Sequence, residues 1–301
     1  MIEVLKIAFF SGIGAGTVAI LATIAIERLG GRLGGVIGTL PTTIIPASWG
    51  LWYQAIGNTK DTLGHSEITF EHFSAAMYAV PAGMCLNALF LWLWRIIPQR
   101  YQWVNKWSET DESGLFKAVG LMSLITLGLW SICAMIWVLI SQHILHSTAE
   151  RLASGVISLI LIITIGVWAT RDSYLAPKGN NKVGVSTLLS RGLCAALAVS
   201  IAVLISKSGA STLAGVAAVF PAIFWTTMVS LWLTQGQAVP SGAVGPMMLG
   251  SSSVAVFALS APSIYVYVGP LIGSMVAWGL AAALASIPSY LWVSRGAMSR
   301  D

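Results

Sequence analysis

The feature that most limits how this chain can fold is a long stretch without charge. Residues 208–294 contain no Asp, Glu, Lys, Arg or His, which makes 87 consecutive uncharged residues. A helix that crosses a bilayer needs about 20 apolar residues, so this stretch suits three spans rather than two. Only 9% of the whole chain is charged, compared with about 25% in soluble domains. The sequence therefore predicts an all-α integral membrane protein, and excludes a cytosolic enzyme, a nucleic-acid-binding domain and a disordered chain.

Shorter apolar runs bring the predicted number of transmembrane helices to nine. Turn-forming residues at 235–242 and 261–270 divide the long uncharged stretch. The predicted spans are 6–26, 33–56, 73–96, 118–142, 152–170, 188–207, 213–234, 244–264 and 267–292. The sixth span contains Arg191, whose long side chain we expect to extend to the membrane interface. No clear cleavage site follows the first run, so we expect a retained span rather than a signal peptide.

The distribution of Lys and Arg predicts the orientation in the membrane. Nine spans put the two termini on opposite sides. Twelve of the sixteen Lys and Arg residues then lie on the side of the C-terminus, and four lie on the side of the N-terminus. Because cytoplasmic loops carry the excess of positive charge, we expect the N-terminus outside and the C-terminus in the cytoplasm. The expected location is the cell membrane, which in a bacterium is the inner membrane. The net charge of +5 then reflects topology and predicts no nucleic-acid partner.

A shift of 180 residues brings out an internal repeat. Residues 12–52 and 192–232 share nine identities, and Pro41 aligns with Pro221. The matched proline and a matched Leu-Trp pair carry more weight than matches between the abundant Gly, Ala and Leu residues. The repeat makes the first four predicted spans equivalent to the last four, with the fifth span between them.

Counting the crossings gives the two repeats opposite orientations. Four spans return the chain to its starting side and the fifth carries it across, so the second repeat enters from the opposite face. The predicted parts are a first four-helix repeat at 1–145, a linking transmembrane helix and cytoplasmic loop at 146–187, and a second four-helix repeat at 188–301. An inverted four-plus-four repeat of this kind is typical of secondary transporters, whose sites lie near the middle of the membrane.

The second repeat resembles a known family. Residues 191–232 look like the GlpM family of small four-span membrane proteins, and the likeness extends loosely over 190–293. The shared motifs are Lys207-Ser208, Ala214-Gly215 and Phe220-Pro221. The first repeat departs from this pattern, with Glu27 and Leu40 at two of the corresponding positions. The resemblance implies a four-span unit and no particular substrate. A fused, inverted pair of such units is also similar in architecture to drug/metabolite transporters.

Prolines near the centres of the second and seventh predicted spans mark a candidate substrate site. A proline inside a helix removes a backbone hydrogen bond, and two equivalent interrupted helices are typical of a transporter site. With the neighbouring hydroxyls and tryptophans and one amide in the third span, the candidate substrate-binding residues are Thr39, Pro41, Thr42, Thr43, Trp49, Asn87, Pro221, Trp225 and Thr226. The alternative is structural: packing kinks, tryptophans against lipid or core, and an amide that bonds between helices.

The ionisable residues narrow the class of solute. No Asp or Glu lies inside a predicted span, although membrane carboxylates are the usual proton relays and counter-ions for cations. A neutral or anionic solute is therefore favoured over an organic cation. The four histidines all map to the outer side, and imidazoles beside carboxylates suit a transition metal. The candidate metal ligands are His65, His72, His143 and His146. A pH-sensing cluster and ordinary loop residues are the alternatives.

These features predict a function in transport. We expect alternating-access movement of a small neutral or anionic solute, without a cofactor and without enzyme activity. The chain contains no phosphate loop, nucleophile–base pair or haem motif. The expected partners are the solute and the lipid bilayer, with a second copy of the chain as a further candidate. One alternative is a membrane subunit or assembly factor of a larger complex. Another is a membrane-embedded enzyme or metal-handling protein that uses the outer histidines.

Overall fold

Helices account for 93% of the residues that the structure describes. This computed structural model describes residues 2–29, 40–59, 65–101, 104, 112–171, 184–236 and 238–298, and no strand occurs within these ranges. The helices are α1 (Ile2–Leu29), α3 (Ile44–Thr59), α4 (His65–Arg100), α6 (Glu112–Ile144), α7 (Thr148–Arg171), α8 (Val185–Lys207), α9 (Ser211–Ala218), α10 (Ala222–Gln235), α11 (Ala238–Gly250), α12 (Ser252–Ala281) and α13 (Ile287–Met298). A π-helical turn at Ala282–Ser286 joins the last two.

Seven helical segments of the described chain are long and apolar enough to cross a membrane. They are Ile2–Ala25, Phe70–Arg100, Glu112–Ile144, Thr148–Arg171, Val185–Lys207, Ser211–Gln235 and Ser241–Arg295. The chain is therefore a multi-span membrane protein, as its composition predicts. The number differs from nine for two reasons. The last segment is 55 residues long and is interrupted at Gly269, whose φ of 74° is not helical, so it has the length of two spans. The second predicted span, 33–56, is described only from residue 40, and its helix α3 is 16 residues long, which is shorter than a full span.

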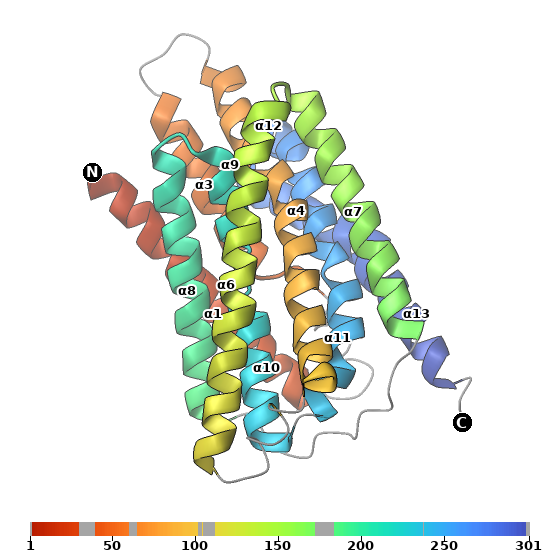
Figure 1. The fold of residues 1–301 in the computed structure, drawn as a ribbon. Helices are drawn as coiled ribbons and strands as arrows, with labels where there is room; N and C mark the ends of the chain where they lie inside the picture. The colour runs from red at the N-terminus through yellow and green to blue at the C-terminus, as the bar shows by residue number, and fades with distance from the viewer. Residues whose placement is uncertain are drawn as a thin grey trace.

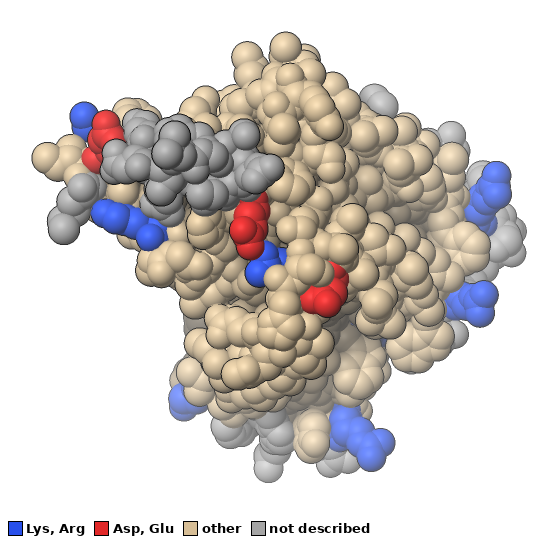
Figure 2. Space-filling model, turned by 90° about the horizontal axis from the view of Figure 1, so that it is seen from above, with Lys and Arg blue, Asp and Glu red and all other residues tan. Residues whose placement is uncertain are grey.

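The outward surfaces of the bundle are apolar. Leu124 on α6, Leu197 on α8 and Leu271 on α12 are largely exposed, together with many other large aliphatic side chains. Soluble monomers rarely expose such continuous apolar surface. Lipid is the natural environment for the sides of a bundle with this composition. Figure 2 looks from above onto the ends of the helices, where a few acidic and basic groups lie near the centre among mainly uncharged residues.

The long helices run the length of the bundle, so their ends gather at two opposite faces (Figure 1). The turns that join α6 to α7 and α8 to α9 lie at the upper end of this view, and the turn between α10 and α11 lies at the lower end. α4 is the central helix and packs against α3, α6, α7, α9 and α12. Its span is the most buried of the seven, which explains why it carries small and aromatic residues on every side.

α1 and α8 pack closely in antiparallel directions. A Cβ atom built on Gly12 would lie 2.8 Å from the backbone oxygen of Ala196, and one built on Gly16 would lie 2.7 Å from that of Gly192. Glycine is needed at these positions because the two backbones are in contact. Further along the seam, the Ser200 hydroxyl donates to the backbone oxygen of Ala8. A shift of 180 residues along the sequence converts the contact between Gly12 and Ala196 into the contact between Gly192 and Gly16.

Pro41 and Pro221 lie in the same kind of turn. α9 ends at Ala218 and α10 begins at Ala222, so Pro221 interrupts the helix as predicted. The backbone N–H of Ala222 donates to the oxygen of Phe220 at 2.7 Å, across a single residue. The N–H of Thr42 donates to the oxygen of Leu40 at 2.9 Å in the same manner, just before α3 begins. Both turns are of the three-residue type with a proline at the centre.

Arg191 does not extend to the interface, and this part of the prediction is wrong. Its side chain is only 8% exposed and lies against α1, where its Nη1 donates to the Thr23 hydroxyl at 2.8 Å. The guanidinium finds a hydroxyl within the protein, whereas the prediction assumed that only the aqueous interface could solvate it.

Candidate functional site

The turn at Pro221 is stabilised by Asn87 from the central helix. The interruption frees backbone carbonyls, and the oxygen of Val219 accepts a hydrogen bond from Nδ2 of Asn87 at 2.8 Å. Trp130 on α6 donates its indole N–H to Oδ1 of the same amide at 2.8 Å. Asn87 is 2% exposed. The amide therefore joins α4, α6 and the interrupted helix, which is the interhelical role that the sequence left as the alternative.

Two tryptophans that follow the proline turns bond to serines in the opposite half of the chain. Trp49 on α3 donates to Oγ of Ser274 on α12 at 2.6 Å. Trp225 on α10 donates to Oγ of Ser123 on α6 at 2.8 Å. α3 and α6 precede α7 in the chain, whereas α10 and α12 follow it. Each interrupted helix is thus fastened to a long helix of the other half.

A buried chain of hydroxyls accompanies Trp49. The Ser48 hydroxyl lies 2.7 Å from the phenol oxygen of Tyr265, which in turn lies 2.8 Å from Oγ of Ser274. The ring of Tyr265 stacks on Phe73 with 5.2 Å between the ring centres. Because the polar atoms are paired and the rings exclude water, this cluster holds α3 and α12 in one arrangement.

The remaining predicted substrate-binding residues have structural contacts in this conformation. Pro41 and Pro221 are buried, and Thr42 and Thr43 are half-buried. The Thr226 hydroxyl donates to the Ala222 oxygen of its own helix at 2.8 Å, as hydroxyls in membrane helices commonly do. Thr39 lies outside the described residues. None of the predicted residues that the structure describes lines the pocket at the upper end of the bundle.

Sequence reasoning missed the serines and the tyrosine that pair with the predicted tryptophans. Ser123 and Ser274 lie near the beginnings of the fourth and ninth predicted spans. The predicted repeat would make these two spans equivalent, so a hydroxyl near the start of both was a usable signal. Nothing in the sequence singled out Tyr265.

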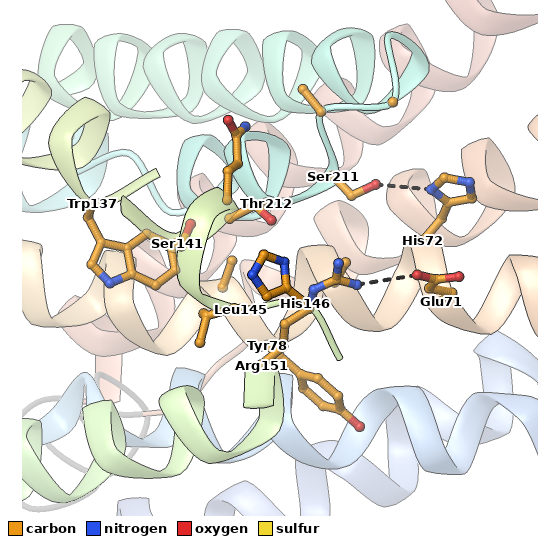
Figure 3. Close-up of a pocket in the computed structure, with 15 residues that line it drawn as sticks. Glu71, His72, Tyr78, Trp137, Ser141, Leu145, His146, Arg151, Ser211 and Thr212 are labelled. Carbon is orange, nitrogen blue, oxygen red and sulfur yellow. Dashed lines mark hydrogen bonds and ion pairs between the residues drawn. The ribbon is translucent and has the colours of Figure 1, made fainter. Parts of the chain in front are cut away.

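The pocket has a cavity volume of about 300 Å³, and it is lined by helix ends and turns that lie toward the upper end of the bundle in Figure 1. Its walls come from residues 71–79 of α4, the last turns of α6 with the connection to α7, the first turn of α7, and the turn between α8 and α9 with the start of α9 (Figure 3). Its side-chain lining includes Glu71, His72, Tyr78, Trp137, Ser141, Gln142, Leu145, His146, Arg151, Ser211 and Thr212. The pocket therefore combines a guanidinium–carboxylate pair and two imidazoles with an apolar wall.

Arg151 is the cation of this pocket. Its Nη1 lies 3.6 Å from Oε1 of Glu71, and the two side chains are 22% and 61% exposed. Such an exposed pair adds little stability, but it holds the guanidinium toward the cavity. His146 lies beside Arg151 in the middle of the pocket, and Nδ1 of His72 lies 3.4 Å from Oγ of Ser211 at its edge (Figure 3). Guanidinium, imidazole and hydroxyl groups together suit a small polar solute with an acidic group.

The pocket extends toward the interrupted helix. Its α4 lining runs from Glu71 to Ala79, a rise of about 12 Å, and two further turns lead to Asn87. On α6 the corresponding step runs from Trp137, in the lining, to Trp130, which bonds to Asn87. Apolar packing closes the region between the two. A Cβ atom built on Gly83 would lie 2.5 Å from Cγ2 of Val219.

The N-terminus of α7, beside the pocket, is stabilised by a capping box. The backbone N–H of Glu150 donates to Oγ of Ser147 at 3.2 Å, and Oε2 of Glu150 accepts from the N–H of Ser147 at 3.0 Å and of His146 at 2.6 Å. The Ser-x-x-Glu spacing predicts this arrangement at a helix start, although the predicted span began later. The cap holds the backbone of His146 in place over the pocket.

The predicted metal ligands separate into different positions. His72 and His146 line the pocket, whereas His143 is exposed and is not in the lining. The side chain of His65 lies outside the described part of the chain. Within that part, no three His, Cys, Asp or Glu side chains come close enough together to hold a metal ion.

Comparison with known proteins adds no relative: no family model, curated protein or solved structure matches this chain.

Proposed function

We propose that this chain is a secondary transporter that moves a small neutral or anionic solute across the cell membrane by alternating access. The observation that carries the proposal is the pair of proline turns. Pro41 and Pro221 are 180 residues apart, they lie in the same kind of turn, and the helix after each turn is hydrogen-bonded to the other half. Paired interruptions of this kind supply backbone groups for a substrate in the middle of a membrane.

The proposal includes nine spans in an inverted four-plus-four repeat. The seam between α1 and α8 supports it, because Gly12 with Ala196 and Gly16 with Gly192 are exchanged by the shift that relates the proline turns. Contacts that map onto themselves are expected at a two-fold axis. The excess of Lys and Arg supports an N-terminus outside and a C-terminus in the cytoplasm. The upper end in Figure 1 is then the outside. The likeness of residues 191–232 to the GlpM family supports the four-span unit alone.

In this proposal the pocket is the outer vestibule and the proline turns form the substrate position below it. Packing of Val219 against Gly83 closes the passage between them in the present conformation. Reorientation of the two halves would break the bonds of Trp49 and Trp225 to the opposite half and open the other side. The glycine-lined seam between α1 and α8 lets the backbones move past each other without displaced side chains.

A stability screen followed by uptake tests the proposal. Purified protein is heated with panels of small acids, neutral metabolites and divalent metals, because a ligand of the native state raises the melting temperature. Any stabilising solute is then offered to proteoliposomes. We expect one class of solute to stabilise the protein and to enter the vesicles with saturation. Arg151→Gln is expected to weaken binding of an anionic solute at least tenfold, whereas Arg295→Gln, an exposed site on α13, serves as the matched control.

Three other outcomes would contradict the proposal. A partner that co-purifies in fixed ratio, with no stabilising solute, would favour a subunit of a larger complex. Stabilisation by metals alone would favour a metal-handling protein. The presence of His72 and His146 in one pocket favours a membrane enzyme as the second candidate function. His72→Ala with His146→Ala would then abolish turnover of a lipid-borne substrate, whereas a transporter whose site lies at the proline turns keeps saturable uptake, with a lower affinity for an anionic solute.

A further inference from the structure

Arg191 is a buried charge within a membrane-spanning helix. It lies in α8, six residues beyond the start at Val185 and so about 9 Å into the helix. Its side chain is 8% exposed. Charged side chains inside a membrane are costly, and they persist where they pair with an opposite charge or serve a site.

The protein supplies only part of what this guanidinium needs. Its Nη1 donates to the Thr23 hydroxyl at 2.8 Å, and that hydroxyl donates onward to the Ala19 oxygen at 2.8 Å, which fixes its direction. The Nε atom of Arg191 is buried and has no hydrogen-bond partner. Among the side chains that the structure describes, which do not include that of Glu27, no carboxylate lies within ion-pair distance of Arg191. The described contacts thus hold a permanently charged group by a neutral one and leave one donor without a partner.

A bound oxyanion would complete this arrangement. The guanidinium presents its donors as a planar fork that matches the two oxygens of a carboxylate or a phosphate. Because Thr23 engages Nη1, the edge at Nε is the part of the guanidinium that is left without a protein partner. We propose that Arg191, held by Thr23, binds the carboxylate or phosphate group of a small anion between α1 and α8.

The position of this site makes the two sides of the proposed transporter unequal. Arg191 lies near the lower end of α8, away from the pocket, and this inference rests on the proposed function only in assigning that end to the cytoplasm. In the 180-residue shift that relates the proline turns, Ser11 aligns with Arg191 and Val203 aligns with Thr23. The equivalent place near the outside therefore has no cation. An anionic solute would be held more strongly on the cytoplasmic side.

Anion binding in detergent tests the site without requiring transport. Delipidated protein is titrated with sodium phosphate and sodium acetate against sodium chloride at equal ionic strength, and binding is followed by melting temperature and calorimetry. We expect saturable stabilisation by phosphate or acetate beyond that of chloride. Arg191→Gln should weaken it at least tenfold. Arg191→Lys should weaken it too, because an ammonium keeps the charge but loses the fork. Arg295→Gln, at an exposed site, should leave it unchanged.

The stability of the protein in the absence of phosphate or acetate shows whether Arg191 is a binding residue or a structural one. Removing an unpaired buried charge should leave Arg191→Gln at least as stable as the wild type in chloride, whereas breaking an internal ion pair lowers stability strongly. Glu27 follows Thr23 by one helical turn in sequence. If Glu27→Gln and Arg191→Gln both lower the melting temperature and no oxyanion raises it, the proposal is overturned. If Arg191→Gln does not fold, Arg191→Lys and Thr23→Val provide the same comparison.

Lipid phosphate and a free anion are distinguished by a parallel titration. Phosphatidylglycerol and phosphatidylcholine are added to the detergent-solubilised protein. Stabilisation by phosphatidylglycerol that depends on Arg191 and competes with inorganic phosphate would assign the site to a lipid headgroup, which still supports an oxyanion site. Binding that requires Arg191, without uptake into vesicles, would refute the transporter and keep the site. Uptake without Arg191-dependent binding would support the transporter and refute the anion site.

Discussion

Asn87 shows how one side chain can hold an interrupted helix in a membrane. Lipid offers no hydrogen bonds, so the Val219 carbonyl freed by the turn must find a partner within the protein. Asn87 provides the donor, and its own oxygen is satisfied by Trp130. An amide is suited to this place because it donates and accepts at the same time.

Asn87→Leu is therefore expected to be strongly destabilising. The change leaves the Val219 oxygen and the Trp130 indole N–H buried without partners, which costs about 1–3 kcal/mol for each group. The free energy of unfolding in mixed micelles with a denaturing detergent measures the loss. Thr164→Val is the control, because that exposed hydroxyl bonds only to its own helix. A loss no larger than that of the control would show that the turn does not depend on Asn87.

The tryptophan–serine bonds fasten each interrupted helix to the opposite half of the chain. Trp49 with Ser274 and Trp225 with Ser123 are the two cases. Both bonds join helices that are far apart in sequence, so they fix the arrangement of the halves rather than the shape of either one.

A double-mutant cycle on Trp225→Phe and Ser123→Ala should give a coupling energy of about 1 kcal/mol, the usual net value of one hydrogen bond. The two single variants and the double variant are compared by unfolding in mixed micelles. Trp168→Phe, at an exposed position on α7, controls for the smaller ring. If the effects of the two single changes simply add, the bond contributes nothing to holding α10 against α6.

Two glycines with different surroundings should respond in opposite directions to the same change. Gly16→Ala places a methyl group against the Gly192 oxygen, and such overpacking costs about 1–3 kcal/mol. Gly120→Ala meets nothing within 4 Å and should stabilise α6 by up to about 1 kcal/mol through helix propensity. Melting temperatures of the two variants provide the comparison. Equal shifts would mean that α1 and α8 are not held in backbone contact.

The whole molecule combines parts that the sequence predicts well with parts that it predicts poorly. The helical class and the turn at Pro221 follow from composition and proline chemistry, which act locally. The burial of Arg191 was missed because α8 is apolar on all sides, so its pattern does not show which side faces α1. The pocket was missed because the fold brings together His72 from α4 and His146 from the connection between α6 and α7. Long-range pairings of this kind leave no local signal.

The orientation of the molecule can be tested by labelling single cysteines in intact cells. Cys85, Cys133 and Cys194 are first replaced by Ala, and one new cysteine is introduced at Ala149 or at Gln99, both exposed and near opposite ends of the bundle. A membrane-impermeant maleimide should label Ala149→Cys in intact cells, and Gln99→Cys only after the membrane is opened. The reverse pattern would invert the topology, and labelling of both in intact cells would refute the assigned crossings.

The seam between α1 and α8 also bears on ancestry. The 180-residue shift exchanges the contact of Gly12 with Ala196 and the contact of Gly16 with Gly192. The surface of α1 at this seam is therefore equivalent to the surface of α8 that it contacts. A self-matching surface allows two copies of a short ancestor to pair before their genes are joined. Copies that face opposite ways can be fused head to tail only through an odd number of crossings. In the arrangement that we propose, α7 is the helix that made such a fusion workable.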